Sequence, residues 1–413
     1  EDAKRLCREI GAELTVLELD ALSDPAVAAN PADRCYHCKR NLFGTLAARA
    51  LADATGGTML TAGAHDPLGR PVQAGLALLG DGRTAVVETA AASGLALLRP
   101  SERDPKATTS YGTGELIRAA LDAGAETIIV GLGGSATNDA GCGLLQALGV
   151  RLLDHDGRDV RPGGAALAEV ERVDLSGLDR RLGDVHVIAA CDVTNPLTGP
   201  EGASAVFGPQ KGASREDVTL LDGALRHVSS VIERALAEQV PAERNGDGGK
   251  VEAAVAESSS PGHRSRPDHR TRTPIADHPG AGAAGGIGMA LLAVLHADFR
   301  PGIDLVIEQS GLDAAAQWAD IVFTGEGSID AQTMFGKTPV GVASVAKRHG
   351  KPVIAIAGHV GDGIECLHGR GIDAVFGAAP GAASLDELLR DARANVARTA
   401  EQVTRLMRIV RSH

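Results

Sequence analysis

The sequence has few aromatic residues: Phe, Tyr and Trp make up 2% of its 413 residues, although hydrophobic residues make up 44%. Ala, Val, Leu and Ile must therefore fill the interior, and these side chains suit buried parallel strands and closely packed helices. A chain of this length exceeds what one compact core usually holds, so we expect two or three domains.

Positive charge, long hydrophobic runs and closely spaced cysteines are also scarce. The net charge of −12 argues against a general nucleic-acid binder, although it does not exclude an anionic small substrate. No apolar run approaches the ~20 residues that cross a bilayer, and the first residues do not resemble a signal peptide. Six scattered cysteines do not form a secreted disulfide framework. We expect a cytoplasmic protein that acts on a small molecule without nucleic-acid or membrane partners; a homo-oligomer stays open.

Short apolar runs alternate with segments of helical period along the chain. We expect strands at 14–19, 72–79, 84–87, 127–130, 186–190, 320–323, 353–357 and 374–376. Helices are expected at 3–10, 41–54, 113–121, 138–148, 215–239, 287–296, 340–349 and from 385 onward. This order predicts an α/β protein with a parallel sheet between helical layers. Residues 241–279, rich in Arg, His, Ser and Pro, are expected to form a disordered insertion.

Three glycine-rich segments follow or interrupt these apolar runs. They cover residues 131–141, 280–286 and 324–330. Glycine lets backbone approach a ligand closely, and the free amides at a helix start attract anions. Ligands of parallel sheets bind at the carboxyl ends of strands, where Gly131, Asp192 and Gly325 are all expected. Together the three segments predict an enzyme that handles phosphate.

The first glycine-rich segment carries hydroxyl and amide groups that suit an oxyanion. The expected binding residues are Gly133, Gly134, Ser135, Thr137 and Asn138. A simpler alternative is that the two glycines only allow close packing of helix on strand.

The same segment also fits a dinucleotide-binding fingerprint, with Gly131, Gly133 and Ala136 at the required spacing. Asp154 then stands near the position of a ribose-binding acid. A dinucleotide-dependent oxidoreductase is therefore the rival enzyme, although the fingerprint lies deep in the chain.

Two further candidates follow the strand expected at 186–190. Asp192 stands at a strand end before Asn195, where a carboxylate can bind magnesium or accept a hydroxyl proton. An Asx turn at the Asn195–Pro196 bend is the alternative. Lys211 follows Gly208-Pro209-Gln210, a turn that we expect to project the cation toward a shared cleft, although a surface lysine is the commoner outcome.

The third glycine-rich segment offers the largest set of chemical groups. Carboxylates come from Glu326 and Asp330, a cation from Lys337, and backbone or side-chain ligands from Thr324, Gly325, Gln332 and Thr333. Phosphoryl transfer needs such a set: metal-bound oxygens, cations near the developing charge and a positioned hydroxyl. We expect this segment to be a loop directly after the buried strand at 320–323. Its glycine spacing is not that of a Walker loop.

A Cys-x-x-Cys pair, Cys35 and Cys38, could bind zinc, hold an iron–sulfur cluster or exchange thiols. A structural zinc site needs two more ligands, and the remaining cysteines provide no second pair. Thiols without a role are the favoured interpretation.

From about residue 52 to 409 the chain resembles the bacterial glycerate kinase family of the glucarate and glyoxylate pathways. The resemblance is carried by residues 66–71, 108–117, 131–143, 190–197, 199–213, 280–288 and 323–343. It implies phosphorylation of D-glycerate to 2-phosphoglycerate with ATP and Mg²⁺. It also implies a flavodoxin-like α/β domain, ending with residues 298–413, into which a second α/β domain of residues 56–297 is inserted. Gly285, in the 280–288 motif, joins the expected binding residues.

The expected roles are inferred from the chemistry of the side chains, because the resemblance alone does not assign them. Asp192 and Asp330 are the preferred candidates for metal binding or hydroxyl activation. Lys211 and Lys337 would offset phosphate charge.

The first 50 residues depart from that family. It opens with a strand and an Asp-Ser-Phe-Lys-Gly loop, followed by an Ala-Asp-Gly-Gly-Glu-Gly-Thr loop, and this chain has neither. Residues 1–50, through 29–39, instead resemble the middle of the ATP-dependent sacrificial sulfur transferase of nickel-pincer cofactor biosynthesis. The first strand region is thus replaced, and we expect residues 14–19 to fill part of its place. An alternative function is a catalytically silent fusion that retains nucleotide binding.

Overall fold

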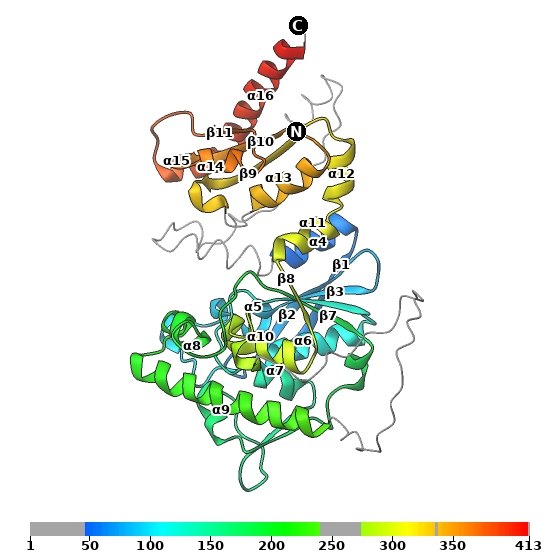
Figure 1. Ribbon diagram of the computed structural model, residues 1–413, viewed down its shortest axis with the longest axis vertical. Helices are drawn as coiled ribbons and strands as arrows, with labels where there is room; N and C mark the ends of the chain where they lie inside the picture. The colour runs from blue at the N-terminus through cyan, green and yellow to red at the C-terminus, as the bar shows by residue number, and fades with distance from the viewer. Residues whose placement is uncertain (1–45, 240–273, 335–337, 412–413) are drawn as a thin grey trace, which may run out of the picture. The chain divides into compact units, whose positions relative to one another are not determined.

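The computed structural model describes residues 46–239, 274–334 and 338–411, which have a mixed α/β fold with parallel sheet regions (Figure 1). They divide into two compact units. The first holds the described residues up to Met59, the segment Ala77–Arg83 and the residues from Arg300 onward. The second holds Leu60–Leu76 and Thr84–Phe299. The elements predicted at 3–10 and 14–19, and the Cys35–Cys38 pair, lie outside the described residues.

A six-stranded sheet, most of whose residues belong to the second unit, has the order β1-β2-β3-β4-β7-β8. Its strands are β1 (Thr58–His65), β2 (Pro71–Leu78), β3 (Thr84–Glu88), β4 (Thr127–Gly131), β7 (His186–Ala190) and β8 (Asp298–Arg300). The helices of the second unit are α5 (Thr89–Ser93), α6 (Tyr111–Asp122), α7 (Cys142–Ala147), α8 (Ala203–Phe207), α9 (Arg215–Gln239) and α10 (Ala283–Ala293). Its 3-10 helices are η2 (Leu95–Leu97), η3 (Pro100–Glu102), η4 (Gly164–Glu169), η5 (Arg180–Gly183), η6 (Pro209–Lys211) and η8 (Ile275–Asp277).

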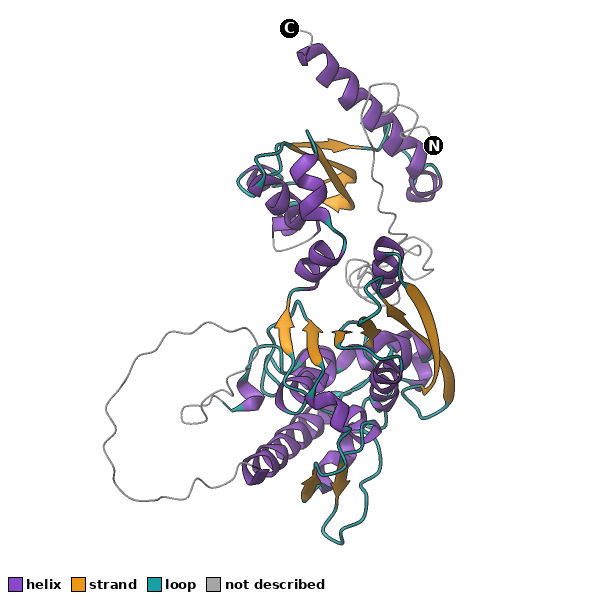
Figure 2. Cartoon of the chain, turned by 90° about the vertical axis from the view of Figure 1, so that its right-hand side faces the viewer, coloured by secondary structure: helices purple, strands orange, loops and turns teal. Residues whose placement is uncertain are grey.

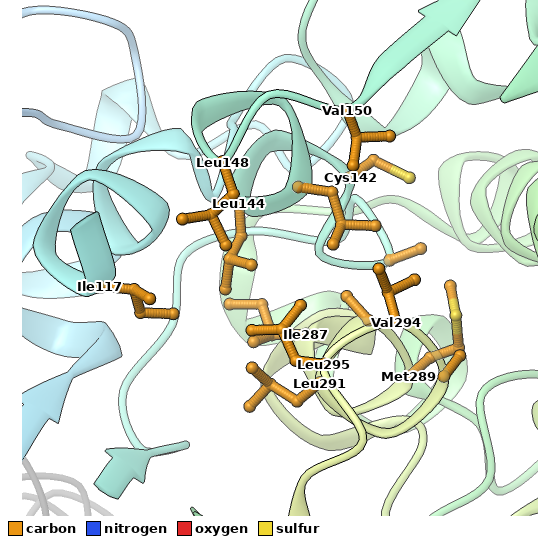
Figure 3. Close-up of a cluster of buried hydrophobic side chains, with 14 of the residues drawn as sticks. Ile117, Cys142, Leu144, Leu148, Val150, Ile287, Met289, Leu291, Val294 and Leu295 are labelled. Carbon is orange, nitrogen blue, oxygen red and sulfur yellow. The ribbon is translucent and has the colours of Figure 1, made fainter. Parts of the chain in front are cut away.

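The central strands of this sheet are apolar because both of their faces are covered. In β4, Ile128, Ile129 and Val130 are each at most 3% exposed. Strand β4 runs parallel to β3 and to β7, as expected for strands buried between helical layers. Side chains of α6, α7 and α10 meet in the main core, where Ile287 and Leu291 face Leu144 (Figure 3).

Strands β1, β2 and β3 follow one another through short turns. The first turn is closed by a hydrogen bond from the Asp66 amide to the Arg70 carbonyl, and the second by one from the Gly82 amide to the Leu79 carbonyl. Neighbouring strands joined by such short turns are antiparallel, so β1 has the direction of β3 and β4. The hairpin predicted around residues 80–82 is present. A separate antiparallel pair, β5 (Arg151–Leu153) with β6 (Arg172–Asp174), was not predicted.

The first unit contains a three-stranded parallel sheet in the order β11-β10-β9. Its strands are β9 (Val322–Ile329), β10 (Val353–Val360) and β11 (Ala374–Gly377). Its helices are α4 (Leu46–Thr55), α11 (Gly302–Gln309), α12 (Leu312–Trp318), α13 (Thr338–Arg348), α14 (Glu365–His368), α15 (Leu385–Arg390) and α16 (Ala392–Arg411), with the 3-10 helix η9 (Ala331–Met334). Figure 2 shows helices beside the strands in both units.

Successive residues of β10 pack on opposite faces of this small sheet. Val353 and Ala355 belong to a cluster that includes Ala343 of α13. Ile354 instead belongs to a cluster with Val403 of α16. The alternation covers the sheet with helices on both faces, as predicted from the apolar run at 353–357.

Several expected boundaries are wrong. Helix α7 begins at Cys142 rather than at residue 138, because Ala140 and Gly141 have left-handed backbone angles, with φ of 56° and 70°. Strand β9 continues to Ile329, past its predicted end at residue 323. The predicted insertion at 241–279 extends too far, because residues 274–279 belong to the described structure and the Ile275 amide donates to Glu233 at 2.6 Å.

Within the described residues, no helix combines the length and the apolar character needed to cross a membrane.

Candidate active site

Three parallel strands of the second unit end side by side. In the ladder Glu88 of β3 pairs with Gly131 of β4, and Gly131 pairs with Ala190 of β7. Asp192, two residues beyond the end of β7, is exposed. The sequence therefore correctly predicted that the first glycine loop and Asp192 lie at the same edge of one sheet, where parallel sheets bind ligands.

The loop after β4 has amides available for a ligand. Its course is fixed by other groups: the Leu132 amide donates to the Ala190 carbonyl, and the Leu95 amide donates to the Gly134 carbonyl. Across residues 46–239, 274–334 and 338–411, no protein acceptor takes a bond from the amides of Gly133 or Gly134. Gly134 has a φ of 69°, which an L side chain rarely adopts. The arrangement suits an oxyanion at the sheet edge.

Lys211 does not project into a cleft as predicted. Its side chain is 2% exposed, and its Nζ donates to the Ser135 hydroxyl at 2.8 Å and to the Thr137 carbonyl at 2.7 Å. Burial lowers the pKa of Lys211 to about 7, because the interior disfavours the charged amine. The side chain therefore points into the interior, where it bonds to two residues of the glycine loop.

The other polar side chains of this loop are buried as well. Thr137 and Asn138 are fully buried, and the Asn138 Nδ2 group donates to the Ser204 hydroxyl at 2.9 Å. In the described part of the chain, Thr137 Oγ1 and Asn138 Oδ1 have no hydrogen-bond partner. The Asn138 side chain therefore anchors the loop to Ser204, whereas the backbone of Gly133 and Gly134 follows the end of β4.

Asp139 organises the chain that follows the loop. Its carboxylate accepts bonds from the amide and hydroxyl of Ser110, at 2.7 and 2.9 Å, and from the amides of Gly141 and Gly143, both at 3.2 Å. Burial raises the pKa of Asp139, and these hydrogen bonds oppose the rise. The carboxylate thereby fixes the starts of α6 and α7 against each other.

Gly285 packs directly against the backbone of the glycine loop. Its φ is 72°, and a Cβ atom placed there would lie 1.8 Å from the Thr137 carbonyl oxygen. The Ala140 amide donates to the Gly285 carbonyl at 3.1 Å. The second glycine-rich segment therefore allows two backbones to pack in direct contact.

Asn195 is engaged within its own loop. Its side-chain Nδ2 group donates to the Glu201 carbonyl at 2.8 Å, and its backbone carbonyl accepts from the Gly282 amide at 3.0 Å. It therefore connects the chain after β7 to the second glycine-rich segment.

The third glycine-rich segment, in the first unit, begins as a strand rather than as the predicted loop. Thr324, Gly325 and Glu326 lie within β9, and Glu326 pairs with Ala357 of β10. A Cβ at Gly325 would lie 2.2 Å from the Ile356 carbonyl oxygen, so glycine permits this close approach. The strand extends because β10 continues beside it as far as Val360.

Polar groups gather where β9 ends. The hydroxyl of Thr333, a fully buried residue, donates to Glu326 Oε1 at 2.5 Å, and the Asp330 amide donates to this hydroxyl at 3.3 Å. Ser328 and His359 lie side by side, with Oγ and Nδ1 3.2 Å apart. The structure thus brings Glu326, Asp330 and Thr333 together. Lys337 and the Gln332 side chain lie outside the described part of the chain.

Among the described residues, neither Asp192 nor Asp330 belongs to a group of three side chains that could share a metal ion. Within the described ranges, the one group of three potential ligand side chains close enough to share an ion is Asp154, His155 and Asp156. Mg²⁺ usually binds one or two carboxylates together with substrate phosphates. An exposed carboxylate beside the amide loop, such as that of Asp192, fits this requirement.

The rival dinucleotide interpretation fails at Asp154. This residue follows β5, which pairs antiparallel with β6 instead of joining the parallel sheet. Its carboxylate accepts bonds from the amides of Asp156 and Arg158, both at 2.9 Å, inside a surface turn. The helix after the loop also begins late, at Cys142. The ribose-binding geometry of the fingerprint is therefore missing.

A model of the glycerate kinase family matches residues 44–408. The chain belongs to the glycerate kinase family. The glycerate kinase of Bacillus subtilis (strain 168) is 45% identical over 364 residues, which are 88% of this chain and 86% of the relative. The glycerate 2-kinase of Escherichia coli (strain K12) is 43% identical over 360 residues, with coverages of 87% and 85%. The crystal structure of a Salmonella typhimurium LT2 protein assigned as glycerate kinase 2 superposes with a TM-score of 0.74 at 44% identity, covering 90% of this chain and 88% of the other.

The glycerate kinase match accounts for the main part of the chain. It begins at residue 44, so the similarity of residues 1–50 to a sulfur transferase stays a prediction. Two polar residues at this sheet edge, Glu88 and Thr89, were not among the predicted candidates. Glu88 and Thr89 stand at the end of β3, are at most 2% exposed, and directly follow the predicted strand at 84–87. Their position directly after a buried strand could have identified them as candidates.

Proposed function

We propose that the chain transfers the terminal phosphoryl group of ATP to the 2-hydroxyl of D-glycerate, giving 2-phosphoglycerate and ADP. Its 43% identity to a glycerate 2-kinase supports the choice of substrate and hydroxyl. The main structural support is the pair of amides at Gly133 and Gly134, which have no protein acceptor among the described residues. They suit an oxyanion, and both substrates carry one.

Roles follow from position. The amides of Gly133 and Gly134 would bind the carboxylate of glycerate or a phosphate of ATP. Asp192, exposed at the end of β7, would accept the proton of the attacking hydroxyl or hold Mg²⁺. Mg²⁺, when bound, would neutralise phosphate charge. Lys211, buried against the loop, would offset phosphate charge when it is protonated.

A second group of residues would serve the same reaction from the first unit. Glu326, Thr333 and Asp330 gather at the end of β9, and Asp330 is the other candidate for metal binding or proton transfer. Thr324, Gly325 and Gln332 would contribute backbone or side-chain ligands, and Lys337 a cation.

We also propose that the second unit is a domain inserted into a flavodoxin-like domain. The first unit is made of separate segments of the chain, and its segments before Leu60 and after Phe299 flank the second unit in sequence, which supports this proposal. Its parallel sheet with helices on both faces suits a flavodoxin-like domain.

The function is tested by D-glycerate-dependent ADP release, with ³¹P NMR to identify the product. We expect 2-phosphoglycerate, and we expect Asp192→Asn to lower kcat/KM at least about 100-fold, as for loss of a general base or metal ligand. Asp184→Asn is the matched control, because Asp184 is also exposed but precedes β7 at the opposite end of the strand. Asp330→Ala is compared with Asp320→Ala in the same way, because Asp320 precedes β9.

Two results would contradict the proposal. Tight ATP binding without product at any D-glycerate concentration would indicate a silent fusion. Equal turnover of the Asp192→Asn and Asp184→Asn variants would remove Asp192 from the site.

A further inference from the structure

Lys211 is an unusual lysine because it is buried against a loop in which the amides of Gly133 and Gly134 have no protein acceptor among the described residues. Its side chain is 2% exposed. The next residue, Gly212, has a φ of 99°, and a Cβ there would lie 2.2 Å from the Arg103 carbonyl oxygen. This close contact fixes the end of η6. The direction of the lysine side chain is therefore set by the backbone.

The lysine ties together two residues of the loop. Its Nζ donates to Ser135 Oγ at 2.8 Å and to the Thr137 carbonyl at 2.7 Å. The same Thr137 carbonyl lies against Gly285 on another side. Gly133 and Gly134 immediately precede this tethered segment, so the orientation of their amides depends on it.

The amine can hold this tether in either protonation state. Both contacts are donated by Nζ, and a neutral amine still has the two N–H groups that they need. Burial lowers the pKa of Lys211 to about 7, and the charge of Asp139 opposes this shift. Helix α8, which packs against η6, contains only Ala, Ser, Val and Phe and has no titratable side chain.

A bound oxyanion would change this balance. Negative charge a few ångströms from a buried amine raises its pKa by about 1–3 units. The amine would then take a proton from solvent and present a cation beneath the anion. Protein and ligand bonds stay unchanged in this step, in which one proton moves from buffer to Nζ.

We propose that Lys211 is a proton-linked positioning residue: it holds Ser135 and Thr137 in the shape that presents the Gly133 and Gly134 amides, and it becomes protonated when a carboxylate or phosphate oxyanion binds them. The proposal rests on the proposed function only for the identity of the natural oxyanions, the carboxylate of D-glycerate and a phosphate of ATP.

Proton uptake on binding tests the proposal. Isothermal titration at pH 8, in two buffers with different ionisation enthalpies, is done with Mg·ATP, D-glycerate and inorganic phosphate as separate ligands. A rise of about 1–2 pKa units from about 7 predicts uptake of about 0.4–0.8 proton per site. The ligand that shows this uptake is the source of the oxyanion on the loop.

Variants separate the charge from the tether. Lys211→Met should remove this uptake and weaken binding of the same ligand about 10- to 100-fold. Ser135→Ala should keep the uptake but weaken binding about 3- to 10-fold, because one contact of the tether is lost. Lys351→Met is the matched control in the other unit and should behave as wild type.

Specific outcomes overturn the proposal. Uptake in folded Lys211→Met equal to wild type would do so, as would failure of all three ligands to bind the wild type. If Lys211→Met does not fold, unchanged affinity in Ser135→Ala overturns it. The proposed function fails separately: wild type that shows lysine-dependent uptake with Mg·ATP but forms no phosphoglycerate would refute the glycerate kinase reaction and support the role of Lys211.

Discussion

Substitution of Gly285 by alanine should strongly destabilise the second unit. Its φ of 72° lies in the left-handed region, which costs an L-residue about 1–2 kcal/mol. The new Cβ would also lie 1.8 Å from the Thr137 carbonyl oxygen and 2.9 Å from the Asn138 Cα. Both neighbours are backbone atoms held by other contacts, so relief requires movement of the glycine loop.

The size of the effect follows from these two terms. Overpacking of a tight interior costs about 1–3 kcal/mol, so the free energy of unfolding should fall by about 2–5 kcal/mol in all. The corresponding fall in Tm is about 5–20 °C for a unit of this size. The single tryptophan, Trp318, lies in the other unit, so far-UV circular dichroism is the suitable probe of urea and thermal unfolding.

Gly223→Ala provides the control. Gly223 is an exposed residue inside α9, and an added Cβ would meet no atom within 4 Å. This variant should gain up to about 1 kcal/mol from helix propensity. Equal stability of Gly285→Ala and wild type would refute the close backbone contact between the two glycine-rich segments.

Three further predictions concern the polar groups. Asp139→Asn should lower the free energy of unfolding, measured in urea, by about 2–4 kcal/mol, since an amide cannot accept all four bonds that the carboxylate receives. A loss below about 0.5 kcal/mol, which is the usual effect of a surface substitution, would contradict this. As pH rises from about 7 toward 10, the wild type should gain stability relative to Lys211→Met. The pKa of Lys211 in the folded state, about 7, lies below the usual 10.5, so in this window the unfolded state binds the proton and the folded state does not. If the free energies of unfolding of the two proteins change in parallel with pH, the lowered pKa is excluded. Thr333→Val should cost about 1–3 kcal/mol in urea unfolding, because it removes the hydroxyl that donates to Glu326, and an unchanged midpoint would show that this bond contributes little.

Elements that depend on local apolar pattern could be predicted from the sequence. The runs at 127–130 and 186–190 are continuously apolar because β4 and β7 are buried on both faces. Their order predicted parallel strands, and with it the meeting of the glycine loop and Asp192 at one sheet edge. The position of the candidate site followed from this topology alone.

The details that failed depend on contacts between distant residues. Residues 138–141 have a helical apolar period, yet Ala140 is left-handed and its amide bonds to the Gly285 carbonyl, far away in sequence. Lys211 appeared to be an exposed cation, but its acceptors are more than 70 residues away. Glu326 was expected in a loop, although the backbone of β10 extends beside it. Local sequence carries no signal for such partners.

The central claim is that the amides of Gly133 and Gly134 bind an oxyanion of a glycerate kinase substrate. Selective ¹⁵N-glycine labelling, with Gly133→Ala and Gly134→Ala variants to assign two of the 52 glycine signals, measures this directly. We predict that Mg·ATP or D-glycerate shifts both amide protons downfield, as expected when they gain a charged acceptor, while Gly223 stays unchanged. If saturation of the protein with both substrates moves neither amide signal, the Gly133 and Gly134 amides do not bind the oxyanion.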